Sequence, residues 1–236
     1  MLRQGIPHTV ITNEAEAQDY IDTYDGIRVR AVRSEGIGLV RREILRMARL
    51  RGERTIWMID DDITTLSDRD ESSLTKSGKP QYLPYPWRPA LLDMQRLMDM
   101  HPDVGAVSPM VRHFAWTFDQ PRWNRRMGYV VRLRTDGPWD YWPHFHEDTD
   151  LTLQILTAGW RTIHLNQYAY QTPAMGTLEG GCHAGYLSGE DERGGRLLVE
   201  KWEQTHPGLV RLDRSVGGSV TTRIDWKRFG KGEQVV

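Results

Sequence analysis

The sequence has 236 residues, which can bury one substantial hydrophobic core, and we expect a single domain with the residues after about 194 as a C-terminal extension. Apolar residues make up 39% and charged residues 27%, and the net charge of −1 gives no overall basic signature for nucleic acid. The single cysteine, Cys182, excludes an internal disulfide. No apolar run is long enough to span a bilayer and no secretory signal is evident, so we expect no membrane association and a cytoplasmic location.

The first sixty residues alternate between strand-like and helix-like patterns. The expected elements are a strand over 8–12, a helix over 14–24, a strand over 27–32 and a helix over 37–50. The last helix has an apolar stripe at helical spacing, formed by Ile37, Val40, Ile44, Met47 and Ala48, and an outer face with Arg42, Arg46 and Arg49. This alternation predicts an α/β domain with a mainly parallel central sheet flanked by helices.

A short apolar strand over 55–59 ends in three consecutive carboxylates, Asp60, Asp61 and Asp62, which we call the aspartate trio. Strands buried on both faces belong to parallel sheets, and such sheets bind ligands at the carboxyl ends of their strands. Three adjacent carboxylates repel one another unless a cation lies between them, and a hard divalent ion with oxygen ligands meets that need. The pattern therefore indicates a metal-held diphosphate, with a solvated acidic turn as the alternative.

Arginines gather in two segments of the chain. Nine lie between residues 28 and 54, and a second group consists of Arg122, Arg125, Arg126, Arg132 and Arg134. A guanidinium group matches the oxygens of a phosphate, so these segments suit the phosphates of a nucleotide or a polynucleotide. A solvated helix face explains any single arginine equally well.

The segment 63–89 is first polar and then rich in proline and aromatic residues. A connection of this length inside a compact domain is typical of a lid or binding loop. A helix over 88–100 and strands over 104–108 and 129–133 are expected to follow. Between residues 113 and 142, tryptophans lie among arginines, which suits base stacking and phosphate neutralisation, although core packing explains the same residues.

A second acidic motif, the pair Glu147 and Asp148, precedes an apolar helical pattern over 151–158 that a glycine closes. A carboxylate fixed at the start of a helix can act as a general base if it reaches an attacking hydroxyl. Two alternatives remain open. Asp148 caps the helix, or His144 and His146 join a carboxylate in a metal site.

The aspartate trio, the acidic pair and the segment 159–163 before a further strand together resemble the GT-A glycosyltransferases, which use nucleotide sugars. In that family the trio matches the metal-binding DxD motif and the pair matches the catalytic xED motif, and the resemblance covers roughly residues 8–185. A narrower resemblance, to the TET-associated glycosyltransferases of bacteriophages, rests on residues 147–153, Gly180-Gly181-Cys182 and His206-Pro207-Gly208. Those enzymes are thought to glycosylate hydroxymethylated pyrimidines in DNA.

The resemblance implies a metal-dependent, inverting transfer of a sugar from a nucleotide sugar, with UDP as the expected nucleotide, to the hydroxyl of 5-hydroxymethylcytosine in phage DNA. The implied metal ligands for Mn²⁺ or Mg²⁺ are Asp62, Asp60 and His183. The implied donor-binding residues are Asp60, which would also hold the ribose, Asp61, Arg41 and Arg42. The implied catalytic residues are Asp148, as general base, and Glu147. A phage-encoded enzyme would work in the cytoplasm of the infected host cell.

The nearest alternative is the same chemistry on a glycan, protein, lipid or small-molecule acceptor. A nucleotidyltransferase also uses carboxylate-bound metal on an α/β sheet, but its product would carry a nucleotide in place of a sugar. A DNA-binding module whose acids only cap secondary structure would bind DNA indifferently to Mn²⁺ and would hydrolyse no nucleotide sugar.

Overall fold

A seven-stranded sheet forms the centre of the chain, which a computed structural model describes at residues 4–33, 36–115, 120–173, 185, 188–214 and 220–230. Its strands are β3 (Thr55–Ile59), β4 (Thr65–Leu74), β5 (Pro80–Pro84), β6 (Val104–Val111), β7 (Arg122–Trp123), β8 (Val130–Arg134) and β9 (Arg161–Gln171). They follow the order β3-β8-β6-β9-β4-β5, and β7 pairs with β9.

The sheet is mixed. β6 and β9 pair in parallel, whereas β3–β8, β6–β8, β4–β9, β4–β5 and β7–β9 pair antiparallel. The predicted α/β class is confirmed, but the prediction of a mainly parallel sheet is wrong. Parallel neighbours need a crossover connection of about a dozen residues or more, usually a helix. Between β6 and β8 the described chain holds only the short α4 (Arg112–Ala115) and β7, so β8 runs back antiparallel to β6.

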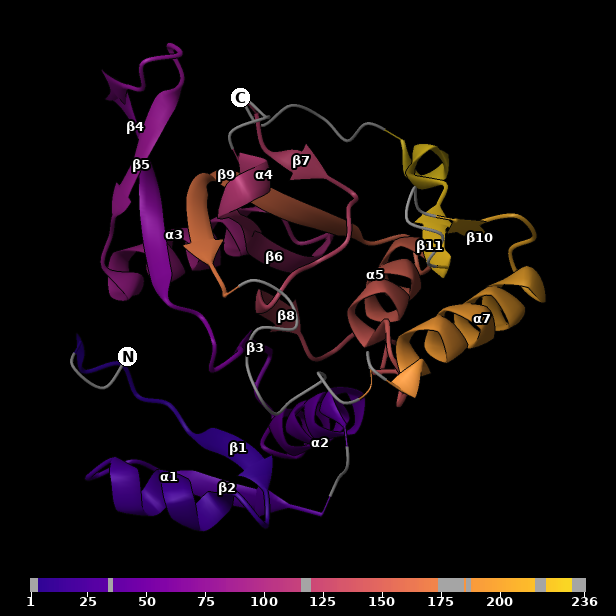
Figure 1. Cartoon of the computed structure of the whole chain (residues 1–236), viewed down its shortest axis with the longest axis horizontal. Coiled ribbons are helices and arrows are strands. Elements are labelled where there is room, and N and C mark those ends of the chain that lie inside the picture. The colour runs from indigo at the N-terminus through magenta and orange to yellow at the C-terminus, as the bar shows by residue number, and fades with distance from the viewer. Residues whose placement is uncertain are drawn as a thin grey trace.

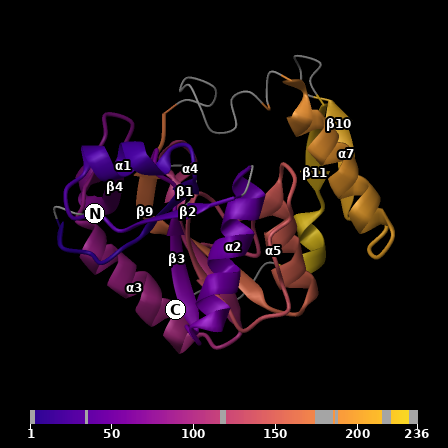
Figure 2. The same ribbon diagram turned by 90° about the horizontal axis from the view of Figure 1, so that it is seen from below.

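Helices cover both faces of the sheet (Figure 2). α3 (Trp87–Met100) packs on one face, where Met94 is fully buried, and α2 (Ile37–Leu50) and α5 (Glu147–Thr157) pack side by side on the other, where Leu45 is fully buried. Alternate residues of β3 point into these two cores, as the pleat of a strand requires. The helix predicted over 37–50 and the strand predicted over 55–59 are confirmed with those bounds.

The buried face of α2 differs from the predicted stripe. Met47 and Ala48 are buried as expected, but Ile37, Val40 and Ile44 are only partly buried. The residues of α2 that are buried are Gly38, Arg41, Leu45, Met47 and Ala48. The buried face is therefore turned so that it includes an arginine, because α2 packs against the charged start of α5 as well as against the sheet.

The N-terminal part of the chain forms a separate unit of β1 (Val10–Asn13), α1 (Ala17–Thr23) and β2 (Val29–Val32). β1 and β2 pair in parallel with each other and not with the central sheet, which departs from the single sheet that the alternating pattern suggested. The expected strand, helix and strand are all present. α1 has no buried residue, and Figure 1 shows this N-terminal unit apart from the sheet, beside α2.

The segment predicted as a lid or binding loop is mostly a β-hairpin. β4 and β5 pair antiparallel, and Thr65 to Asp68 of β4 also pair with β9, so the hairpin extends the central sheet. In Figure 1 it stands out from the body on the side opposite α7. No sequence pattern marks strands here, because most of β4 beyond Ser67 is only partly buried and needs no apolar alternation.

The C-terminal residues pack against α5. α7 (Glu190–Glu203), β10 (Val210–Arg214), β11 (Val220–Ile224) and the short 3₁₀ helix η2 (Trp226–Phe229) follow one another there. Leu198 and Trp202 of α7 share an apolar cluster with Leu153 of α5. No helix among the described residues is long and apolar enough to cross a membrane.

Candidate active site

The aspartate trio follows β3 directly, and each of its members has a different environment. The Asp60 carboxylate accepts hydrogen bonds of 2.6 and 2.8 Å from Nη2 of Arg41. Oδ2 of Asp61 accepts a hydrogen bond of 2.5 Å from the hydroxyl of Tyr20 in α1. Oδ1 of Asp62 is buried and has no hydrogen-bond partner among the described residues. The trio therefore contains one buried carboxylate oxygen, Oδ1 of Asp62, that has no hydrogen-bond partner among the described residues.

The electrostatics of Asp62 favour a cation at this point. Burial raises the pKa of Asp62, and the neighbouring charges of Asp60 and Asp61 raise it further. A divalent ion would reverse both effects, since it compensates the lost hydration and the repulsion. Among the described residues no group of three or more His, Cys, Asp or Glu side chains could hold an ion by itself. Mg²⁺, however, is often bound by one or two carboxylates together with substrate phosphates, and Asp62 fits that role.

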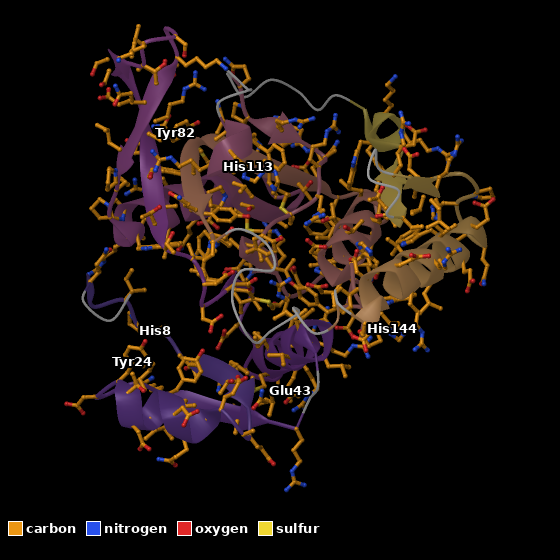
Figure 3. All side chains as sticks on the ribbon, viewed as in Figure 1. His8, Tyr24, Glu43, Tyr82, His113 and His144 are labelled. Carbon is orange, nitrogen blue, oxygen red and sulfur yellow. The ribbon has the colours of Figure 1, made fainter. Side chains whose placement is uncertain are left out.

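Of the histidines that the sequence analysis named as possible metal ligands, the structure describes His144 and His146. His183 lies outside the described residues. The His144 ring packs against Trp142 with centroids 5.5 Å apart, and Figure 3 shows it beside the start of α7. Nε2 of His146 lies 3.4 Å from Oδ1 of Asp191 in α7. The alternative of a metal site built from His144 and His146 is therefore wrong within the described residues.

The acidic pair opens α5, and each of its members faces an arginine. Oε1 of Glu147 lies 2.8 Å from Nη1 of Arg41, and Oδ2 of Asp148 lies 2.9 Å from Nε of Arg126. Oδ1 of Asp148 accepts a hydrogen bond of 2.6 Å from the backbone N–H of Thr149. The residue before the helix is His146, so Asp148 is not the N-cap, contrary to the capping alternative. Burial, and then the charge of Asp148, raise the pKa of Glu147 to about 7, while Arg41 opposes this.

Arg41 joins the two acidic motifs. Its guanidinium group contacts Asp60 through Nη2 and Glu147 through Nη1, and the residue is only 5% exposed. Burial disfavours the charge of Arg41, but Asp60 and Glu147 outweigh it and raise the pKa of Arg41. Motifs that lie most of a domain apart in the sequence thus share one buried cation.

A glycine in α2 permits this contact. A Cβ atom added to Gly38 would lie 2.1 Å from the carbonyl oxygen of Trp142 and 3.3 Å from Cβ of Glu147. Any side chain at this position would push α2 away from the loop that leads into α5. Because Arg41 lies one helical turn after Gly38, the close approach of the two helices places its guanidinium group at Glu147.

A cleft of about 3290 Å³ lies between the N-terminal unit and the sheet. Residues of the site that line it include the aspartate trio, Tyr20, Arg41 and Arg126. Glu147 and Asp148 are not among the lining residues, because Arg41 and Arg126 lie next to their carboxylates. Arg42 is also not among them: its Nε donates to the carbonyl oxygen of Tyr141, and it lies 3.2 Å from Asp140. The prediction that Arg42 binds the donor stays a prediction without support from this arrangement.

Two residues of the site had no individual role in the sequence analysis. Tyr20 is 41 positions from Asp61, and nothing in the pattern of the first helix marks it as a partner for an aspartate. Arg126 belonged to the second arginine group, but its pairing with Asp148 depends on how the chain returns from β7 to β8. In both cases the contact is tertiary and has no local signal.

One family of known proteins matches most of the chain. No curated protein matches the chain. A family model described as TET-Associated Glycosyltransferase matches residues 2–181, which include the aspartate trio, Arg41, Arg126 and the acidic pair. The match spans well over half of the chain and confirms the predicted resemblance. The chain therefore belongs to the TET-associated glycosyltransferase family and is a glycosyltransferase.

Proposed function

We propose that this glycosyltransferase moves a sugar from a UDP-linked donor to the hydroxyl of 5-hydroxymethylcytosine in DNA, with inversion at the anomeric carbon. The observation that carries the proposal is the Arg41 bridge, with contacts of 2.6 Å to Asp60 and 2.8 Å to Glu147. Arg41 thereby links two sets of carboxylates. Asp60 belongs to the trio, which suits a cation and a diphosphate, and Glu147 belongs to the acidic pair, which suits proton transfer. A sugar transfer needs both functions within the length of one donor molecule.

The donor diphosphate is proposed to lie at the aspartate trio. Asp62, with its buried and unpartnered Oδ1, would hold Mn²⁺ or Mg²⁺, and Asp61 would support the site through its hydrogen bond with Tyr20. When bound, the ion neutralises the charge that builds on the departing diphosphate. Asp60 is less free to contact the ribose than the sequence suggested, because Arg41 already donates to both of its oxygens.

Asp148 is proposed as the general base. Its backbone contact with Thr149 and its place in α5 fix the carboxylate, and its pairing with Arg126 keeps it close to the cleft wall. The side chain of Arg126 is 48% exposed, so it can turn aside when an acceptor hydroxyl approaches. Contacts of a catalytic base are often incomplete before substrate binds. The acceptor oxygen would then attack the anomeric carbon as Asp148 receives its proton.

The cleft has room for such a pair of substrates. Small-molecule sites usually enclose roughly 300–1,000 Å³, and this cleft is about 3290 Å³. A base in a duplex must leave the stack before its hydroxymethyl group can reach the carboxylate, which costs about a few kcal/mol. Contacts with the DNA phosphates would offset that cost, and such binding should weaken as salt rises.

The test is incubation of the protein with a panel of nucleotide sugars and with DNA that contains 5-hydroxymethylcytosine, followed by mass spectrometry of the digested nucleosides. We expect a mass increase of one hexose residue on hydroxymethylated cytosine with one UDP-sugar. EDTA should abolish the product and Mn²⁺ should restore it. Matched DNA with unmodified cytosine is the control and should stay unchanged. Hexose on a glycan or protein acceptor but not on DNA would contradict the proposed acceptor, and a nucleotide adduct would contradict sugar transfer.

A further inference from the structure

The C-terminal helix α7 contacts the first turn of α5, the turn that carries the acidic pair. Figures 1 and 2 both show α7 beside α5. The family match ends at residue 181 and so does not include α7, which begins at Glu190. The contacts between the two helices include a buried charge, and they therefore bear on the geometry of the acidic pair as well as on packing.

The buried charge belongs to Asp150, which lies two residues after Asp148 in the first turn of α5 and is 0% exposed. Nζ of Lys201 in α7 donates hydrogen bonds of 2.7 and 2.8 Å to its two carboxylate oxygens. Nε1 of Trp202 donates one of 2.9 Å to Oδ1, and Nε2 of Gln154 donates one of 2.5 Å to Oδ2. A buried carboxylate is costly unless a cation compensates it, and here the cation comes from α7.

The same lysine contacts the segment that leads into α5. Nζ of Lys201 lies 4.0 Å from the centre of the Trp142 ring, which is within the range of a cation–π contact. The carbonyl oxygen of Trp142 is the atom that a side chain at Gly38 would overlap. One ammonium group therefore joins α7 both to α5 and to the loop that packs against α2.

A second contact with α7 lies at the residue before α5. His146 has a φ of 69°, in the left-handed region that few residues other than glycine adopt. Its Nε2 lies 3.2 Å from the backbone carbonyl oxygen of Asp191 in α7. Glycines allow this approach: a Cβ atom on Gly195 would lie 3.3 Å from the same Nε2, and one on Gly194 would lie 2.6 Å from Cβ of Phe145. A strained backbone persists only where its surroundings hold it, and α7 provides them here.

The two contacts lie on either side of the acidic pair. His146 comes directly before Glu147, and Asp150 comes two residues after Asp148. A general base must lie within hydrogen-bond reach of the proton that it accepts, and a displacement of about 1 Å can cost about 10²-fold in rate. The direction of this turn therefore matters for proton transfer.

We propose that Lys201 is a positioning residue that keeps the first turn of α5, and with it Asp148, in the orientation needed for proton transfer. This inference rests on the proposed function, in which Asp148 is the general base. Lys201 is not among the described residues that line the cleft, so it acts through Asp150 and not through the substrate.

The first test compares kcat with donor binding. Lys201→Met leaves the charge of Asp150 without its cation, and we expect kcat for sugar transfer to fall by about 10- to 100-fold. The affinity and the stoichiometry of UDP binding should stay those of the wild type; the stoichiometry counts folded molecules. Lys201→Arg keeps a cation that can donate to both carboxylate oxygens and should retain most of kcat. Leu209→Ala is the control, because Leu209 is buried in the same apolar cluster but lies on neither helix. It should lower stability and keep kcat per folded molecule.

The second test asks whether Lys201 acts through Asp148. In an Asp148→Asn background, Lys201→Met should lower the residual turnover no further, because the base is already absent. Product accumulated over long incubations measures that residual rate. A purely structural role would lower turnover by the same factor in both backgrounds. Equal factors, or an unchanged kcat in Lys201→Met alone, would overturn the proposal.

The third test needs no substrate. The backbone N–H of Asp150 donates a hydrogen bond of 2.9 Å to the carbonyl oxygen of His146, so its hydrogen exchange reports on the first turn of α5. Exchange there should be faster in Lys201→Met than in the wild type, Lys201→Arg or Leu209→Ala. Unchanged exchange in Lys201→Met rejects the positioning role. Faster exchange in a protein whose wild type transfers no sugar contradicts the proposed function and supports the contact of α7 with α5.

Discussion

The aspartate trio and the acidic pair differ in how far the protein itself neutralises them. Each carboxylate of the pair faces an arginine, Arg41 for Glu147 and Arg126 for Asp148. Among the described residues, Asp60 is the member of the trio that pairs with an arginine, and Asp62 keeps a buried oxygen without a hydrogen-bond partner. The carboxylates of the trio and of the pair therefore suit different roles. Under the proposed function an external cation would complete the trio, whereas each carboxylate of the pair already has an arginine, and Asp148 would receive a proton when the exposed Arg126 moves aside.

The two motifs are not independent, because Arg41 contacts both. A buried arginine between two carboxylates fixes their separation, and removal of Arg41 leaves both carboxylates without their shared cation. Arg41 is therefore a structural link between the two motifs as well as a candidate for donor binding.

The largest expected effect is that of Asp148→Asn on turnover. Asparagine keeps the shape and the contact with Arg126 but cannot accept a proton, and loss of a general base costs about 10²- to 10⁴-fold in rate. We expect kcat for transfer to hydroxymethylated DNA to fall by this factor while UDP affinity stays near that of the wild type. The control is Asp140→Asn, because Asp140 pairs with Arg42 away from the cleft lining. Turnover within a few-fold of the wild type would remove Asp148 from the mechanism.

Arg41→Met tests the link between the motifs by its effect on stability. The change leaves Asp60 and Glu147 without their shared cation, and breaking a buried ion pair in this way costs about 3–5 kcal/mol. For a chain of this size, each kcal/mol lowers the melting temperature by roughly 2–4 °C. Arg42→Met is the neighbouring control: the side chain of Arg42 is 42% exposed in its pair with Asp140, so the loss should stay below about 1 kcal/mol. Equal melting temperatures for the two variants would show that the bridge adds nothing to stability.

The sequence predicted those parts of the fold that depend on local patterns. The bounds of α2 and β3 were correct because an apolar run and its polar or glycine ends lie within a few residues of one another. The strands β4 and β5 were not predicted, because their partly exposed residues carry no apolar alternation. The direction of β8 was also not predictable from the strand itself, because it depends on the connection from β6.

The candidate site shows the same limit. The two acidic motifs were identifiable from residue type and order, and their contact through Arg41 was not. Asp60 and Glu147 lie 19 and 106 positions from Arg41, and the helical spacing of α2 assigned its buried face to apolar residues. A buried arginine is stable only when its partners are in place. The helical spacing put Arg42 on the outer face, but nothing in the helix alone identified the partners of Arg41.

Asp62→Asn tests whether the aspartate trio binds the metal ion. Even a change in the outer partners of a metal ligand weakens metal affinity about 10- to 100-fold, so loss of the carboxylate itself should raise the Mn²⁺ concentration for half-maximal transfer at least tenfold. Asp61→Asn should raise it less, because Tyr20 already engages that carboxylate. A metal titration of transfer activity for both variants gives the result. An unaltered Mn²⁺ response in Asp62→Asn would reject Asp62 as a ligand.

The smallest expected effect concerns the pH dependence of stability at the acidic pair. Because the pKa of Glu147 is raised from 4.5 to about 7, the folded protein binds more protons than the unfolded chain between these values. The free energy of unfolding contributed by this group is therefore fully present below about pH 4.5 and is lost as the pH rises through 7.

Glu147→Gln removes that titration but keeps a side chain that can accept a hydrogen bond from Arg41. Urea unfolding of the wild type at pH 5 and pH 8 should show a larger loss of stability with rising pH than unfolding of the variant. Glu43→Gln is the control, since the hydrogen bond from Arg46 lowers the pKa of Glu43, so that its titration lies below this window. Equal pH slopes for the wild type and Glu147→Gln would mean that Arg41 keeps Glu147 ionised throughout. In that case Arg41 would balance the charge of Glu147 as fully as Arg126 balances that of Asp148.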